Sequence, residues 1–183
     1  MLVPAIAYKD EIEKQFAKRM YSDDMFYYQG YAHGHEMTEI KPQDNVYQWA
    51  IMGKPKTYKE YHSRSGTLIV DDIPILIGYF AYRIAPATDN VYNFGLYSFD
   101  KGNALVAHDV FKKMEELINE HHRIEWRCVG GNPALRGYKK FAMRIATEHP
   151  HWFVNMHQMR DTTKDNQGNY HDEYVFEIVK SGE

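Results

Sequence analysis

The sequence has 183 residues, with 25 acidic and 22 basic side chains and a formal net charge of −3. This balance argues against a dedicated nucleic-acid binder, which needs a basic surface to displace phosphate counterions. The most apolar run, residues 73–82, is too short for a membrane-spanning helix, which takes about 20 residues. The single cysteine, Cys128, allows no internal disulfide and favours a reducing, cytoplasmic location.

Aromatic side chains are unusually common. The 15 Tyr, 9 Phe and 3 Trp outnumber the 22 Lys and Arg. Disordered chains are poor in aromatic residues, so we expect a folded domain whose core is rich in rings. No repeat or composition break divides the chain, and a single domain is expected over residues 1–183.

The N-terminal part predicts a short strand over residues 2–8 and then a helix. Asp10 begins that helix, and Glu13 follows it in the spacing of a capping box. The apolar stripe of this helix consists of Ile12, Phe16 and Met20. Residues 25–36 are expected to be irregular because two glycines interrupt a run of rings. Residues 45–62 stay ambiguous.

Three antiparallel strands are predicted in the centre of the chain, over residues 67–70, 75–84 and 91–99, because β-branched and aromatic residues dominate there. The side chains expected to share one face of the third strand are those of Tyr92, Phe94, Leu96 and Ser98. A helix follows Gly102, with apolar residues at three-to-four spacing up to Ile118.

A further strand is predicted over residues 124–129, and the helical crossover before it requires parallel pairing with the third central strand. Asn132 and Pro133 are suited to be the N-cap and first residue of a last helix. Its stripe consists of Leu135, Tyr138, Phe141 and Ile145. A hairpin around residues 166–169 ends the chain. The predicted fold is α+β, with a mixed, mainly antiparallel sheet flanked by helices and a C-terminal hairpin.

One segment has the chemistry of an anion site. The turn Tyr-Ser-Phe-Asp-Lys-Gly-Asn-Ala, residues 97–104, leads directly into the predicted helix. Backbone N–H groups and the helix dipole at such a start suit a pyrophosphate. The donors would be the N–H groups of Lys101, Gly102, Asn103, Ala104 and Leu105, with the Lys101 side chain adding charge. An ordinary helix start after a turn is the alternative.

This segment, the element order and the sequence Asn-Pro-Ala-Leu-Arg-Gly-Tyr-Lys-Lys-Phe at 132–141 resemble the GNAT superfamily of acyl-coenzyme A-dependent N-acetyltransferases. The likeness is strongest over residues 75–141. The family loop usually reads Arg/Gln-x-x-Gly-x-Gly/Ala, which residues 97–104 match only in part, so the pyrophosphate loop is degenerate.

The resemblance implies transfer of an acetyl group from acetyl-coenzyme A, a coenzyme A thioester, to a primary amine by direct attack. Tyr138 matches the position of the family's general acid, and a tyrosine is protonated at neutral pH. Glu125 is the candidate base, with Asp89, Asp100 or a water chain as alternatives. Asn132 would contact the pantetheine arm. The N–H donors to the thioester carbonyl would come from Leu96, Tyr97 and Ser98.

Residues 21–36 occupy the place where GNAT proteins line the acceptor pocket. Their carboxylates and rings could hold a cationic amine by charge and cation–π contact. The candidate acceptor residues are Asp23, Asp24, Tyr27, Tyr28 and Tyr31. Packing of these rings onto the sheet is the alternative.

No metal is expected, because the histidine clusters at 33–36, 121–122 and 149–151 lack the spacing of zinc sites. Cys128 is expected to be a small buried hydrophobe. A GNAT-fold module that has lost catalysis and serves in binding is the alternative to an enzyme. Nucleic acid and membrane are not expected partners. The acceptor amine and the formation of a homodimer are left open.

Overall fold

The computed structural model describes residues 1–22, 24–29, 39–54, 61–62, 68–69 and 74–181. In chain order the elements are β1 (Leu2–Pro4), the 3-10 helix η1 (Ala5–Tyr8), α1 (Lys9–Ala17), α2 (Asp24–Gln29), β2 (Val46–Gly53), β3 (Tyr61–His62), β4 (Leu68–Ile69), β5 (Ile75–Ala85), β6 (Asn90–Ser98), α3 (Ala104–Glu120), β7 (Arg123–Val129), α4 (Leu135–Glu148), β8 (Phe153–Lys164) and β9 (Tyr170–Val179).

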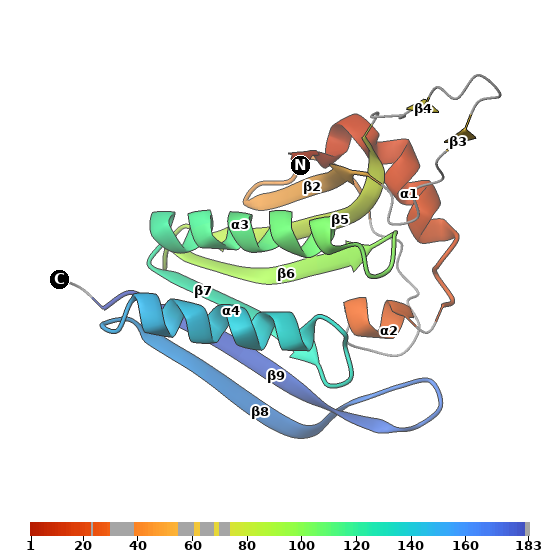
Figure 1. Ribbon diagram of the computed structural model, residues 1–183. Helices are drawn as coiled ribbons and strands as arrows, with labels where there is room; N and C mark the ends of the chain where they lie inside the picture. The colour runs from red at the N-terminus through yellow and green to blue at the C-terminus, as the bar shows by residue number, and fades with distance from the viewer. Residues whose placement is uncertain (23, 30–38, 55–60, 63–67, 70–73, 182–183) are drawn as a thin grey trace.

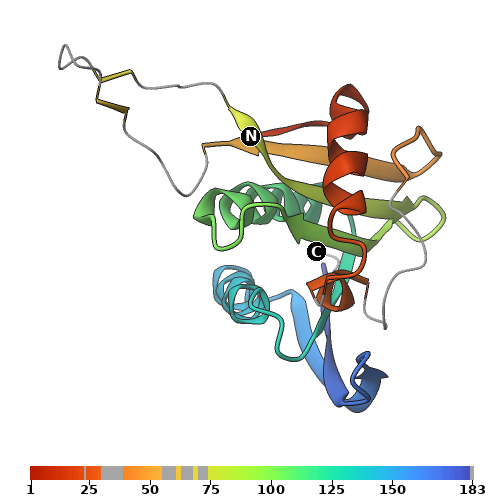
Figure 2. The ribbon, with the colours of Figure 1, turned by 90° about the vertical axis from the view of Figure 1, so that its right-hand side faces the viewer.

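Seven strands form one sheet in the order β1-β2-β5-β6-β7-β9-β8. The helices α3 and α4 cover one face, and α1 and α2 lie on the other (Figures 1 and 2). Only β6 and β7 pair in parallel; the other neighbours in this sheet are antiparallel. The predicted α+β class with a mixed, mainly antiparallel sheet is confirmed.

The parallel pair is short. It joins Asn90 to Arg123 and Val91 to Ile124, and no further register pair between β6 and β7 is found along these two fully described strands. Because β6 continues to Ser98 and β7 to Val129, the strands part toward their carboxyl ends. The sheet therefore opens at its middle, between the two helices that follow these strands.

A β-bulge in β6 corrects one predicted face. The register between β5 and β6 changes from Ala81–Gly95 to Arg83–Tyr92, and Asn93 has a φ of 55°. Phe94 packs on Phe80 and Tyr82 beneath α3, whereas Tyr92 lies opposite Arg83 on the other face. The prediction that Tyr92 shares a face with Phe94 is wrong, because one extra residue reverses the alternation.

Rings fill the core on both faces of the sheet. Beneath α3 and α4, the indole of Trp126 stacks on Phe176, with centroids 5.0 Å apart. Beneath α1, the Phe16 ring lies 5.3–5.4 Å from four other rings, those of Tyr28, Tyr79, Tyr97 and Phe99. The aromatic-rich core expected from composition is therefore present, and it occupies both layers.

Several local predictions in the N-terminal part need correction. The first strand ends at Pro4, and the predicted capping box is absent, since Tyr8 is the N-cap of α1 and makes no side-chain capping bond. The Glu13 carboxylate instead accepts a hydrogen bond from the Ile40 N–H at 3.3 Å. Residues 24–29 form the helix α2 rather than an irregular segment. The rest of that segment, from residue 30 to 36, lies outside the described residues.

The C-terminal part agrees more closely. α3 begins directly after the predicted turn, and the predicted hairpin around residues 166–169 is present between β8 and β9. α4 begins at Leu135, two positions after Pro133, because Asn132 Oδ1 accepts the Ala134 N–H at 2.9 Å and closes a turn before the helix. None of the helices among the described residues is long and apolar enough to cross a membrane.

Candidate active site

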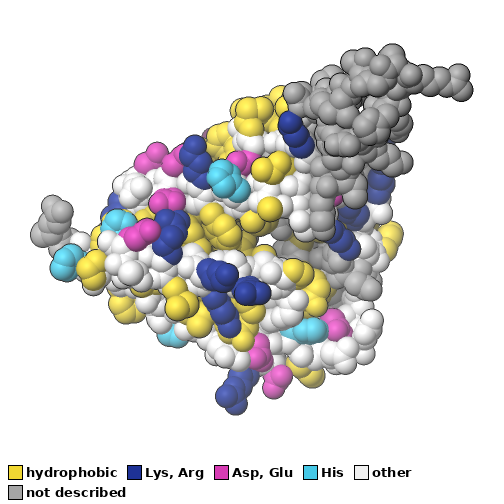
Figure 3. Space-filling model, in the orientation of Figure 1, with side chains coloured by type: hydrophobic (Ala, Val, Ile, Leu, Met, Phe, Trp, Pro, Cys, Tyr) yellow, Lys and Arg dark blue, Asp and Glu magenta, His cyan; other side chains and the backbone are white. Residues whose placement is uncertain are grey.

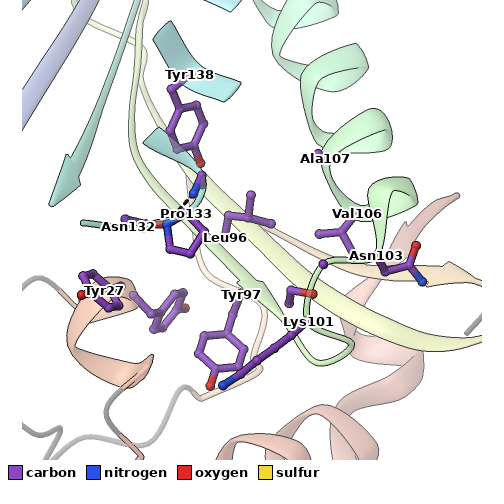
Figure 4. A pocket seen from close by; sticks show the side chains of 14 residues that line it. Tyr27, Leu96, Tyr97, Lys101, Asn103, Val106, Ala107, Asn132, Pro133 and Tyr138 are labelled. Atoms are coloured by element: carbon purple, nitrogen blue, oxygen red, sulfur yellow. Dashed lines mark hydrogen bonds between the residues drawn. The ribbon is translucent and has the colours of Figure 1, made fainter. Parts of the chain in front are cut away.

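A cavity of about 330 Å³ lies where β6 and β7 part (Figure 4). Its lining comes from α2, the end of β6, the loop before α3 and its first turn, the loop that leads into α4, and α4 itself. The lining residues are Tyr27, Tyr28, Leu96, Tyr97, Ser98, Lys101, Gly102, Asn103, Val106, Ala107, Asn132, Pro133, Ala134 and Tyr138. The fold thus brings together both sequence segments singled out above, together with part of the predicted acceptor segment.

Tyr138 projects from α4 into this cavity (Figure 4). Tyr138 is only 6% exposed. Its ring packs edge-on against that of Phe111, and its centroid lies 6.0 Å from that of Trp126. Burial raises the pKa of the Tyr138 hydroxyl well above its usual value near 10, so the group is protonated at neutral pH. The structure gives this hydroxyl no hydrogen bond to any residue it describes. It is thus a proton donor that faces the cavity.

Gly102 and Asn103 have different structural roles in the loop before α3. Gly102 has a φ of 73°, a conformation that costs a glycine little. The Asn103 side chain caps α3 by accepting the Leu105 N–H at 3.0 Å, and it donates to the Lys54 carbonyl at 2.7 Å. The Asn103 N–H donates to the Asp100 carbonyl at 3.1 Å. The loop therefore uses two of the five N–H groups predicted to bind phosphate, those of Asn103 and Leu105.

The end of β6 supplies further donors. Phe99 N–H donates to the Ile77 carbonyl of β5. Since N–H groups alternate in direction along a strand, those of Leu96 and Ser98 point away from β5, toward the opening where β7 has diverged. The predicted segment Leu96–Ser98 therefore borders the cavity, and the N–H groups of Leu96 and Ser98 face the side where β7 has diverged.

Two tyrosines of α2 form the opposite wall. Tyr28 packs edge-on against Tyr97, with centroids 5.5 Å apart, and its ring comes close to the backbone at Gly95. Tyr27 lies over Gly131, where an added Cβ would be 3.2 Å from the tyrosine oxygen. The rings of Tyr27 and Tyr28 therefore both pack against the sheet side of the molecule and line the cavity. Asp23 and Tyr31 lie outside the described residues, as does the Asp24 side chain.

Glu125, the candidate base, is not among the cavity residues. It neighbours Trp126 on β7, and alternation along the strand turns it to the face away from α4. There its carboxylate lies 3.0 Å from the Arg123 guanidinium, which also pairs with Glu177 at 2.7 Å. The structure therefore does not bring Glu125 to Tyr138.

The alternative carboxylates also have structural partners. Asp89 accepts hydrogen bonds from the His121 ring and the His122 backbone, which lower the pKa of its carboxyl. Asp100 accepts the Asn103 side-chain amide at 3.0 Å beside the cavity.

Cys128 is buried, and desolvation raises the pKa of its thiol to about 12, which suits a core residue rather than a nucleophile. Across the described residues, no group of three His, Cys, Asp or Glu side chains could hold a metal ion.

Four lining residues were not singled out for the site by sequence: Val106, Ala107, Pro133 and Ala134. Val106 and Ala107 lie in the first turn of α3, one step beyond the predicted anion loop. Pro133 and Ala134 lie within the quoted segment that follows Asn132. These four residues could have been found only by their position next to a motif, because small and apolar side chains carry no distinctive chemistry.

Neither a scan of protein-family models nor a search of curated proteins gives a match. Solved structures do match. A probable GNAT-family acetyltransferase from Chromobacterium violaceum is similar over 98% of this chain and 85% of its own, with 15% identity and a TM-score of 0.53. An acetyltransferase from Salmonella typhimurium that modifies the N-terminal serine of ribosomal protein L7/L12 matches over 98% and 94%, with 13% identity and a TM-score of 0.50.

Another probable acetyltransferase matches with 16% identity and a TM-score of 0.45, and the aligned part covers 75% of this chain and 62% of that one. This chain therefore spans less than two thirds of that structure's length. The two matches with the higher TM-scores establish the architecture. The protein has the GNAT fold, as the resemblance in the sequence led us to expect.

Proposed function

We propose that this protein is an N-acetyltransferase that moves an acetyl group from acetyl-coenzyme A to a primary amine. One observation carries the proposal: a protonated tyrosine, outward-facing strand N–H groups and the N-terminus of α3 border a single cavity at the opening between β6 and β7. These are a proton donor, a site for a developing oxyanion and a site for phosphate. Fold alone would not justify this assignment.

In the proposed reaction the neutral amine attacks the thioester carbonyl carbon. The carbonyl oxygen gains charge and is stabilised by the N–H groups of Leu96 and Ser98. The carbon–sulfur bond then breaks, and the leaving thiolate takes the proton of the Tyr138 hydroxyl. The nitrogen releases its proton to a base. Because Glu125 lies on the other face of the sheet, it could act as that base only through a chain of water molecules.

Coenzyme A would enter between α3 and α4. Asn132 lines the cavity and would contact the pantetheine arm. The N–H groups of Gly102 and Ala104, with the Lys101 ammonium, are the proposed pyrophosphate contacts. The space-filling view shows an opening between the two helices and Lys and Arg side chains gathered on α4 beside it (Figure 3), and these cations would favour an anionic ligand.

The acceptor would bind at the α2 side of the cavity, against Tyr27 and Tyr28. Asp23, Asp24 and Tyr31 are the further candidates that the sequence offers for holding a cationic amine.

Replacement of Tyr138 by Phe tests the chemistry. Removing the hydroxyl should lower turnover about 100-fold, as expected when a general acid is lost, and should leave the Kd of acetyl-coenzyme A within about twofold, because the ring remains. Turnover is measured by thiol release with a panel containing ethanolamine, benzylamine and a peptide with a free N-terminal serine. Calorimetry gives the Kd. Full activity of Tyr138→Phe would clear the hydroxyl of its role.

A GNAT-fold binding module without catalysis is the second candidate. The capped N-terminus of α3 favours it, because Asn103 and Leu105 no longer offer their N–H groups to a phosphate. Calorimetry with acetyl-coenzyme A separates the two candidates. Absence of both binding and a thermal shift would remove the enzyme proposal, and binding without thiol release across the amine panel would favour the binding module.

A further inference from the structure

The C-terminal hairpin contacts the helix that forms the acceptor wall. His171, near the start of β9, places its ring 4.9 Å from that of Phe26 and 6.5 Å from that of Tyr27, nearly perpendicular to the latter. The Phe26 side chain is only 3% exposed. The two ribbon views agree in placing α2 beside this hairpin (Figures 1 and 2). The imidazole is therefore part of the surface on which α2 rests.

Asp165 fixes the orientation of this imidazole. Its Oδ2 lies 2.9 Å from His171 Nε2. The carboxylate is itself held by the hairpin turn, because its Oδ1 accepts the N–H groups of Gln167 at 2.9 Å and Asn169 at 2.8 Å. The bond to His171 and those from the turn hold the pKa of Asp165 well below its usual range. An ionised carboxylate in a rigid turn thus faces one nitrogen of the histidine.

The other side of Tyr27 is closed by the loop before α4. Gly131 has a φ of 86°, and an added Cβ there would be 3.2 Å from the Tyr27 oxygen. The same strand β9 positions this loop, because the Asp172 carbonyl accepts the Gly130 N–H at 2.6 Å. Two consecutive residues of β9 therefore hold two walls of the cavity: His171 contacts α2, and Asp172 binds the loop before α4. Tyr27 lies between this loop and His171.

We propose that Asp165 and His171 form a positioning pair for the acceptor amine, which fixes α2 on the hairpin and holds Tyr27 at the cavity. His171 does not line the cavity, so it acts through Phe26 and Tyr27 rather than on the reacting atoms. The link to the acceptor rests on the proposed acetyltransferase function. The contact between α2 and the hairpin does not, and it can be tested without turnover.

Hydrogen exchange tests the contact itself. In His171→Ala the amides of α2 should exchange about tenfold faster, as expected when a packed ring pair is lost. Asp165→Asn and His171→Phe should each give a smaller increase, because both retain the ring but lose its bond to the Asp165 carboxylate. His157→Ala is the matched control, a histidine on the same hairpin that hydrogen-bonds to Asn155 at 2.5 Å. The amides of β5 serve as the reference for global stability.

Steady-state kinetics test the consequence, with the best amine of the panel as the probe. His171→Ala should raise the acceptor KM about fivefold or more, as the loss of about 1 kcal/mol of ring packing implies, while the KM of acetyl-coenzyme A stays within about twofold.

Unchanged α2 exchange in His171→Ala overturns the positioning pair, whether or not the protein shows turnover. Faster exchange with an unchanged acceptor KM, or with both KM values raised in parallel, overturns its link to the acceptor. Absence of turnover in the wild type counts against the proposed function and the acceptor link, while the exchange result still decides the positioning pair.

Discussion

The two loops that lead into α3 and α4 contain the same dipeptide and use it differently. Gly102-Asn103 and Gly131-Asn132 both have a glycine with positive φ followed by an asparagine whose side chain accepts an N–H two residues on. Asn103 is 8% exposed and caps the helix directly. Asn132 closes a turn before the helix. Both asparagines line the cavity. Their surroundings, not their local sequence, decide which asparagine caps a helix and which closes the turn before one.

Substitution of the two glycines should give the largest difference in stability between the two loops. Gly131→Ala places a Cβ in a left-handed conformation and against Tyr27, so we expect a loss of about 2 kcal/mol in the free energy of unfolding and a higher acceptor KM. Gly102→Ala, the matched control, also places a Cβ at a positive φ and should lose about 1 kcal/mol for that conformation. Urea denaturation measures both. Equal losses, with no change of acceptor KM, would show that the contact between Tyr27 and Gly131 has no energetic consequence.

Asn103→Ala should have the next largest effect. It removes the cap of α3 and the donor to the Lys54 carbonyl, which together should cost about 1.5 kcal/mol of stability. The Leu105 N–H becomes available, so calorimetry should show acetyl-coenzyme A binding retained in this variant. A stability equal to that of wild type would contradict the role of Asn103 as a buried cap.

Asn132→Ala should have the smallest effect on stability, about 0.5 kcal/mol, because a turn rather than a helix loses its acceptor. Its effect should instead be on the cofactor side of the cavity, as a higher KM for acetyl-coenzyme A with the acceptor KM unchanged. If Asn132→Ala destabilises the protein as much as Asn103→Ala does, the two asparagines have the same structural role and the comparison fails.

Much of the fold could be predicted because its elements have strong local periodicity. The stripes of α3 and α4, the antiparallel pair of β5 and β6, and the hairpin follow from residue spacing, and the helical crossover from β6 to β7 required a parallel pair. The strand predicted beside them over residues 67–70 is instead β4, which pairs with β3 in a separate two-stranded sheet. The capping box at Asp10 failed because the Glu13 carboxylate is used in a contact with Ile40, far along the chain. Local spacing shows what a side chain can do, and tertiary neighbours decide whether it does so.

The sequence by itself determined the architecture, the aromatic core and Tyr138 as a residue turned inward from α4. It could not place Glu125, because alternation along β7 and its ion pair with Arg123 keep the carboxylate on the other face of the sheet. Nor could it show the bulge at Asn93, which changes the strand faces without any change in composition.

Only the tertiary structure decided that His171 would meet Phe26, since contacts between residues so far apart in the chain have no local signal in spacing, charge or turn chemistry.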